Sequence, residues 1–220
     1  MKSILVIGMG RFGKHLALKL LELGNEVMIV DQDEEKIEPY ASLFTDSHIG
    51  DCSNEAVLRS LGINNFDVCF VAISEDFQAS LEITSMLREM GAKYIVSRAN
   101  RDRQARFLLK VGADEVVYPE REIAERLALR FDGKNIADCL DLTADYSIYE
   151  LPVPRRWMGK SVGSLEVARR LNINIIAVKH EDTLKPQPGA GYVFEEGDRM
   201  VVIGRSSDVM GIVSRFERNS

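Results

Sequence analysis

The sequence has few cysteines and no long hydrophobic run. Apolar stretches such as residues 68–74 are closed by Asp67 and Glu75, so none reaches the roughly 18 residues that a membrane-spanning helix needs. The three cysteines form no CxxC pair and are odd in number, which disfavours both a disulfide framework and a zinc site. Residues 1–3 lead into a predicted strand without a signal-peptide pattern. We therefore expect a cytoplasmic protein.

Positive charge is also scarce. The chain has 28 Lys and Arg residues against 34 Asp and Glu residues, a formal net charge of −6. Nucleic acid backbones attract basic surfaces, so we expect no nucleic acid partner. A small anionic ligand stays compatible with this charge, because backbone N–H groups can bind a phosphate locally.

The residue patterns of common catalytic sites are missing as well. There is no Tyr-x-x-x-Lys pair and no serine nucleophile elbow, and we interpret His15, His48 and His180 as structural or exposed. Residues 159–161, Gly-Lys-Ser, resemble the end of a P-loop, but Pro154 stands where its first glycine belongs. The sequence thus favours a binding protein over an enzyme.

Short β-branched runs alternate with amphipathic stretches up to about residue 118. The predicted strands are residues 4–7, 27–30, 47–49, 68–73, 94–97 and 115–118. Strands that alternate with helices pair in parallel through right-handed crossovers, and continuous apolar strands are covered on both faces. We predict an α/β fold with a Rossmann-type, doubly wound parallel sheet.

The pattern changes after a helix predicted for residues 121–131. Predicted strands at 140–142, 147–153, 173–179 and 199–203, with helices at 164–171 and 207–216, indicate a small α+β domain. Residues 186–191 are predicted as a loop, since they are rich in proline and glycine. We place the domains at 1–134 and 135–220.

A glycine-rich motif, Gly8-Met-Gly-Arg-Phe-Gly13, follows the first strand and opens a helix, and Asp31 ends the second strand 18 residues later. Gly8 permits a tight turn, Gly10 lets the backbone approach a phosphate, and Gly13 lets helix and strand pack closely. The helix N-terminus attracts the phosphate. The Asp31 carboxylate is predicted to accept hydrogen bonds from both ribose hydroxyls. It would also repel a 2′-phosphate, which disfavours NADP as a ligand.

Further candidates lie at the same sheet edge. Arg11 is predicted to contact a phosphate, and Asp51 either meets the adenine end or caps the next helix. The predicted nucleotide site comprises Gly8, Gly10, Arg11, Phe12, Gly13, Asp31, Asp51, Cys52, Ala72, Ile73 and Arg98. ATP or ADP and NAD(H) stay open as ligands, because both share the adenosine and first phosphates. An NAD-dependent oxidoreductase with a small substrate domain is the alternative function.

Taken together, these motifs resemble the RCK (KTN) family, the cytoplasmic regulators of potassium channels and of Ktr/Trk potassium transporters. The resemblance covers nearly the whole chain and is strongest to the Ktr type. It rests on the glycine motif, Asp31, Gly50-Asp51, Leu61-Gly-Ile63, Val71-Ala-Ile73, Gln78-Ala-Ser80, Gly112-Ala-Asp114, Tyr118-Pro-Glu120 and, in the tail, Gly159-Lys-Ser161, Ile175–Lys179 and Glu196-Gly-Asp198.

This resemblance implies a Rossmann-type domain followed by an α+β RCK C-terminal domain. It implies a homodimer that assembles into an octameric ring beneath a membrane potassium-transporting subunit, at the inner face of the membrane. Exchange of ATP and ADP would gate the pore, and Glu120 would lie near a divalent or monovalent cation shared across the dimer. A second ligand, cyclic di-AMP, is implied at Arg169, Asn174, Ile175, Ile176, His180 and Pro188.

Overall fold

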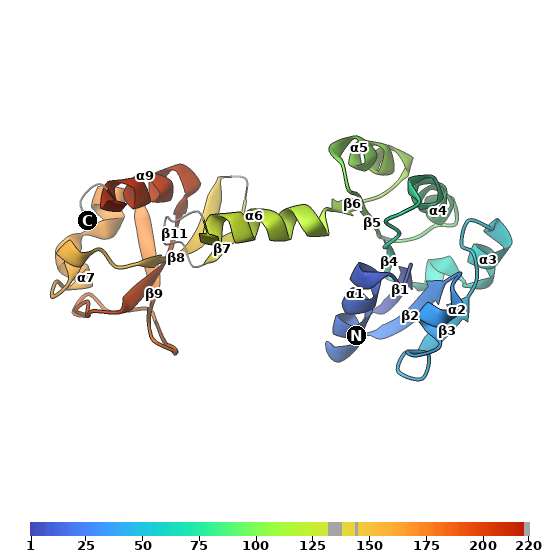
Figure 1. Cartoon of the computed structure of the whole chain (residues 1–220), viewed down its shortest axis with the longest axis horizontal. Helices are drawn as coiled ribbons and strands as arrows, with labels where there is room; N and C mark the ends of the chain where they lie inside the picture. Colours follow the sequence, from blue (N-terminus) through green and yellow to red (C-terminus); the bar gives the residue numbers. More distant parts are fainter. Residues whose placement is uncertain (132–137, 144, 218–220) are drawn as a thin grey trace. The chain divides into compact units, whose positions relative to one another are not determined.

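The computed structural model describes residues 1–131, 138–143 and 145–217 (Figure 1). The chain divides into two compact units, Met1–Glu122 and Ile123–Ser220. The predicted domain boundary at 134/135 falls outside the described residues and stays a prediction. Within the described part of the chain, no helix is long and apolar enough to cross a membrane.

The first unit is built on a six-stranded sheet in the order β3-β2-β1-β4-β5-β6. All its neighbouring strands pair in parallel, which confirms the Rossmann-type prediction. The strands are β1 Ser3–Ile7, β2 Glu26–Asp31, β3 Asp46–Ile49, β4 Val68–Val71, β5 Ile95–Arg98 and β6 Glu115–Val117. From β1 the chain adds β2 and β3 on one side and then β4, β5 and β6 on the other, so the strand order reverses between β1 and β4. Open α/β sheets bind ligands at the carboxyl ends of the strands beside such a switch point.

Both faces of this sheet are covered. Ile4 and Val6 of β1 join one buried cluster, which includes Ala17 of the first helix. Leu5 and Ile7 join a second cluster on the opposite face. Alternate residues of a strand point to opposite faces, so an apolar run such as that of β1 requires helices on both sides.

Helices of the first unit begin and end at residues that the sequence marks. They are α1 Arg11–Glu22, α2 Glu34–Ile37, α3 Glu55–Ser60, the 3-10 turn η1 Ile63–Asn65, α4 Phe77–Glu89 and α5 Asp102–Val111. A further helix, α6 Pro119–Phe131, begins in the first unit and continues into the second. Asn54 caps α3, since its side chain accepts a hydrogen bond from the backbone N–H of Ala56. Gly62 lies in the left-handed region, with φ +68°, and confirms the predicted stop.

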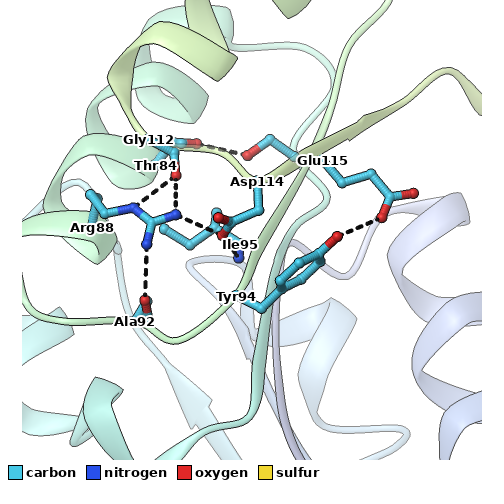
Figure 2. A network of polar contacts seen from close by, with 9 residues as sticks. Thr84, Arg88, Ala92, Tyr94, Ile95, Gly112, Asp114 and Glu115 are labelled. Atoms are coloured by element: carbon cyan, nitrogen blue, oxygen red, sulfur yellow. Dashed lines mark hydrogen bonds and ion pairs between the residues drawn. The ribbon is translucent and has the colours of Figure 1, made fainter.

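Arg88 near the end of α4 ties that helix to the segment between α5 and β6 (Figure 2). Its guanidinium donates to the Gly112 carbonyl at 2.7 and 3.0 Å, to the Ala92 carbonyl at 3.4 Å and to the Asp114 carboxylate at 2.6 Å. Asp114 also accepts from the backbone N–H of Ile95 at 2.8 Å. One side chain therefore fixes the relative position of α4, β5 and β6.

The second unit holds an antiparallel five-stranded sheet in the order β10-β9-β11-β8-β7. Trp157, Phe194 and Met200 belong to its buried core. Its elements are β7 Asp138–Asp141, β8 Tyr146–Pro152, the 3-10 turn η2 Arg155–Trp157, α7 Val162–Leu165, α8 Val167–Leu171, β9 Ile173–His180, β10 Thr183–Pro186, β11 Asp198–Arg205 and α9 Ser206–Glu217. The predicted α+β class is confirmed.

Two details of this unit differ from the sequence prediction. The helix expected over 164–171 is split into α7 and α8 at Glu166, whose φ is +46°. Strand β10 was not predicted, because its four residues are all exposed and show no apolar alternation. This segment is a strand because it pairs with β9, and not because of its own residue pattern.

Candidate functional site

A cavity of about 720 Å³ lies at the carboxyl edge of the parallel sheet. It is lined by segments that follow β1 to β5 and by the first turn of α6, and its volume suits a small-molecule ligand. Of the predicted nucleotide-site residues, these line the cavity: Gly8, Gly10, Arg11, Phe12, Asp31, Asp51, Cys52, Ala72, Ile73 and Arg98, together with Glu120. Gly13 packs against the backbone of Gly8 and is not among the lining residues.

The glycine loop has the geometry that its sequence demands. Gly8 has φ +96°, a conformation that residues with a Cβ rarely adopt. A Cβ on Gly13 would lie 1.9 Å from the Gly8 carbonyl oxygen, whereas a Cβ on Gly10 would meet nothing within 4 Å. Gly8 and Gly13 thus shape the turn, and Gly10 leaves open space beside the backbone.

The N-terminus of α1 presents unsatisfied N–H groups to this cavity. Its N-cap is Gly10, which offers no side-chain cap, and the first turn contains no acidic residue. The first hydrogen bond within the helix comes from the Lys14 N–H to the Gly10 carbonyl, at 2.9 Å. The amides ahead of Lys14 and the helix dipole together favour an anion at this point.

Asp31 is held firmly at the end of β2. Its carboxylate is 9% exposed and accepts from the backbone N–H of Met9 at 2.7 Å and of Asp33 at 3.0 Å. Lys36 Nζ lies 3.8 Å from the same carboxylate. A carboxylate has about four acceptor positions, so lone pairs remain for the hydroxyls of a ribose.

Two arginines line the cavity, and they differ in exposure and in ion pairing. Arg11 is exposed and forms no ion pair with any described residue. The Arg98 side chain is only 10% exposed, donates from Nη2 to Glu120 Oε1, and its Cζ lies 5.6 Å from the Phe12 ring centroid. Its Nε is buried without a hydrogen-bond partner.

Glu120 therefore has an arginine partner within its own unit. The described residues contain no group of three or more His, Cys, Asp or Glu side chains placed to hold a metal ion. The resemblance assigns Glu120 to a cation shared between two chains, and this role stays a prediction.

Cys52 and Asp51 form the wall beside Asp31. Burial, with Asp51 and Asp31 nearby, raises the pKa of the Cys52 thiol to about 12. The thiol therefore stays protonated and acts as a wall of the cavity, not as a nucleophile. Asp51 accepts from the backbone N–H of Ser53, while Asn54 caps α3, so the alternative role of Asp51 as helix cap is wrong.

Sequence reasoning missed several lining residues. The additional polar ones are Gln32, Lys36, Ser53, Glu75 and Asp76. Gln32 directly follows β2, so its position after a strand was an available signal. Lys36 lies on the short helix α2, and only the fold brings it back toward Asp31.

The predicted second ligand set lies in the other unit. β9 carries Asn174, Ile175, Ile176 and His180, and the loop after β10 contains Pro188. That loop is tied to β9, because the Gln187 N–H donates to the Ile176 carbonyl at 2.9 Å. Ile175 packs against the core. His180 Nδ1 lies 2.8 Å from the buried Asp198 carboxylate, and Arg169 on α8 pairs with Glu166.

The parallel sheet, the glycine loop and the cavity at the switch point define a Rossmann-type protein with an added α+β domain. Residues 4–119 match the TrkA-N domain family and residues 146–216 match the TrkA-C domain family. The chain belongs to the family of Ktr and Trk potassium uptake proteins, which the RCK resemblance predicted.

Two curated relatives extend over nearly the whole chain. The chain is 38% identical to the Ktr system potassium uptake protein C of Bacillus subtilis, covering 99% of this chain and 96% of the relative. It is 35% identical to the Ktr system potassium uptake protein A of the same organism, covering 98% and 96%.

A solved structure shares the fold. The GsuK channel bound to NAD superposes with a TM-score of 0.69 at 19% identity, over 94% of this chain and 38% of the channel chain. At this identity the likeness shows the fold alone, and the chain spans less than half the length of that channel chain.

Proposed function

We propose that this protein is a nucleotide-sensing regulatory subunit that gates a membrane potassium transporter of the Ktr/Trk type. The observation that carries the proposal is the cavity at the switch point, where the glycine loop, Arg11 and Asp31 converge in a chain of this family. Ligand-dependent gating requires only that the nucleotide bind two states of the protein with different affinity. No catalytic step is needed, and we propose that the protein is not an enzyme.

The proposed ligands are ATP and ADP, bound with adenosine at Asp31 and Asp51 and phosphates at the N-terminus of α1. Arg11 supports this assignment, because an exposed guanidinium at the helix start suits a terminal phosphate. NAD is the competing ligand, because the GsuK channel, which shares this fold, has been solved bound to NAD.

Two experiments test this function. Mass spectrometry of nucleotides extracted from the purified protein, followed by calorimetric titration with ATP, ADP and NADH, identifies the ligand. Potassium flux into proteoliposomes that contain the transporter then has to change with the nucleotide that is added. Turnover of NADH at 340 nm with a small substrate would favour the oxidoreductase instead.

We propose that the protein works as a homodimer within an octameric ring at the cytoplasmic face of the membrane. The exposed apolar residues of α6 support self-association: Ile123, Leu127 and Phe131 are 59%, 46% and 76% exposed and follow one another at intervals of four. Residues four apart share one face of a helix, so they form a continuous apolar stripe. Exposed apolar patches of this kind mark protein interfaces.

Cyclic di-AMP is the proposed second ligand, at β9 and the loop after β10. The hydrogen bond between Gln187 and Ile176 supports it, because it keeps this loop beside the strand that carries Asn174 and His180. Calorimetric titration with cyclic di-AMP tests the proposal, and Asn174→Ala is expected to lower the affinity without changing the affinity for ATP.

A further inference from the structure

Lys36 is a cavity residue whose charge lies beside Asp31. It is the third residue of α2, it lines the cavity, and its side chain is 46% exposed. Its Nζ lies 3.8 Å from Asp31 Oδ1 and 3.4 Å from Asp33 Oδ2. Both distances exceed the roughly 2.7–2.9 Å of a charge-assisted hydrogen bond. The attraction to these carboxylates therefore leaves N–H donors of the ammonium available to a ligand.

The main chain holds Lys36 at this place. Asp33 caps α2, since its side chain accepts a hydrogen bond from the backbone N–H of Glu35 at 3.1 Å. The Lys36 N–H donates to the Asp33 carbonyl, also at 3.1 Å. Ile37, the next residue, is 1% exposed and belongs to the buried core of the first unit. The cap and this buried neighbour fix the start of the Lys36 side chain near the end of β2.

Asp31 by itself satisfies only half of what a ribose hydroxyl requires. A hydroxyl donates one hydrogen bond and also accepts, whereas an ionised carboxylate only accepts. Asp31 can take the hydrogens of the ribose hydroxyls, but the hydroxyl oxygens then need a donor, because a buried acceptor without a partner costs free energy. Lys36 supplies such donors, and its Nζ lies 3.8 Å from the carboxylate that receives the hydrogens.

We infer that Lys36 and Asp31 together recognise the ribose diol: the 2′ and 3′ hydroxyls donate to the Asp31 carboxylate and accept from the Lys36 ammonium. The ligand class is therefore a nucleotide whose ribose carries both hydroxyls free. A deoxyribose leaves part of the Lys36–Asp31 pair without its hydroxyl partner. The inference deepens the proposed function and rests on it, since it requires that the adenosine of a nucleotide bind at Asp31.

Calorimetric titration of the full-length protein with ATP, adenosine, 2′-deoxy-ATP and 3′-deoxy-ATP tests this role. The wild type is expected to bind ATP about tenfold more tightly than either deoxy analogue, because each analogue lacks hydrogen bonds to charged groups. Lys36→Met is expected to lower the affinities for ATP and adenosine by the same factor, about fivefold to tenfold. Its effect on the deoxy analogues should be about threefold smaller, since one of the hydroxyls that Lys36 contacts is already missing.

Adenosine separates this role from a general effect of charge. A lysine that only attracted the triphosphate would matter for ATP and not for adenosine, so an unchanged affinity of Lys36→Met for adenosine would overturn the inference. Lys19→Met is the matched control, because Lys19 is an exposed lysine of α1 that pairs with Glu22 and does not line the cavity. This variant is expected to bind all four ligands like the wild type.

The deoxy analogues give a second way to contradict the inference. It is wrong if the wild type binds ATP and both analogues equally, or if Lys36→Met lowers the affinities for ATP and both analogues by the same factor. In these cases the wild type still binds ATP, and the proposed function stands. A wild type that binds none of ATP, ADP and NADH overturns both.

Discussion

At the residue scale, Gly10 and Gly13 belong to one motif but face different constraints. Gly13 is in contact with the backbone of Gly8, so any side chain there collides with the turn itself. Gly10 has an extended conformation, with φ −63°, and open space on its Cβ side. Of these two glycines, only Gly10 therefore lines the cavity and leaves its backbone open to a ligand.

Alanine substitutions should separate these roles. Gly13→Ala is expected to lower the free energy of unfolding by about 2 kcal/mol or more, because the Cβ forces the loop to move. Gly10→Ala should fold with nearly unchanged stability but lose about tenfold in ATP affinity, since its Cβ occupies the approach of the phosphate. Urea unfolding and calorimetric titration measure the two effects. Equal stability losses in both variants would contradict the assignment.

Arg11 gives a second prediction at this scale. Arg11→Ala should weaken the binding of ATP by about 1.5–3 kcal/mol and leave the binding of adenosine unchanged, because a charge-assisted hydrogen bond to the phosphate is lost. Lys14→Ala, one turn further along α1, is the control, since Lys14 does not line the cavity. Asp31→Ala should weaken the binding of both ATP and adenosine. If Arg11→Ala weakened adenosine as much as ATP, its phosphate role would be wrong.

At the element scale, the Arg88 network predicts a stability effect far from the cavity. Arg88→Met removes donors to two carbonyls and one carboxylate that join α4, β5 and β6 (Figure 2). We expect the free energy of unfolding to fall by about 1–3 kcal/mol. Arg59→Met is the matched control: its partner is the exposed Glu55 one turn away, and its loss should stay within about 0.5 kcal/mol. Urea unfolding of both variants decides the comparison.

The start of β11 predicts a pH dependence of the second unit. The hydrogen bond to Asp198 raises the pKa of His180 above 6.5, and Glu181 and Glu195 add to the shift. Because the folded-state pKa is the higher one, the stabilisation is fully present below pH 6.5 and is lost as the pH rises through the raised value. Scanning calorimetry should therefore show the largest Tm difference between wild type and His180→Gln in mildly acidic buffer. A difference that grows with pH would contradict this.

At the scale of the whole molecule, the apolar stripe of α6 predicts self-association. Leu127→Glu should lower the molar mass measured by light scattering, because a charge in the stripe disfavours its burial. Leu23→Glu is the control, since Leu23 is 67% exposed at the end of α1 and lies outside the stripe. An unchanged molar mass for Leu127→Glu would show that the stripe is not an interface.

The sequence was informative wherever one local demand decides the structure. The glycines, the caps and the β-branched runs predicted the parallel sheet, its approximate boundaries and ten of the residues that line the cavity. It failed at β10 and at Glu166, where pairing and packing with distant residues override weak local preferences. It also missed Lys36, because nothing in its neighbourhood predicts the approach to Asp31.

The sequence by itself thus determined the class of fold and the glycine loop, because both follow from spacing along the chain. Its resemblance to the RCK family predicted the membership in a potassium uptake family, which the comparisons confirmed. Only the tertiary structure decided that Arg98 and Glu120, 22 residues apart, form an ion pair at the cavity, and that His180 meets a buried Asp198. Such pairs depend on which strands become neighbours. That is a property of the folded sheet, not of any local pattern.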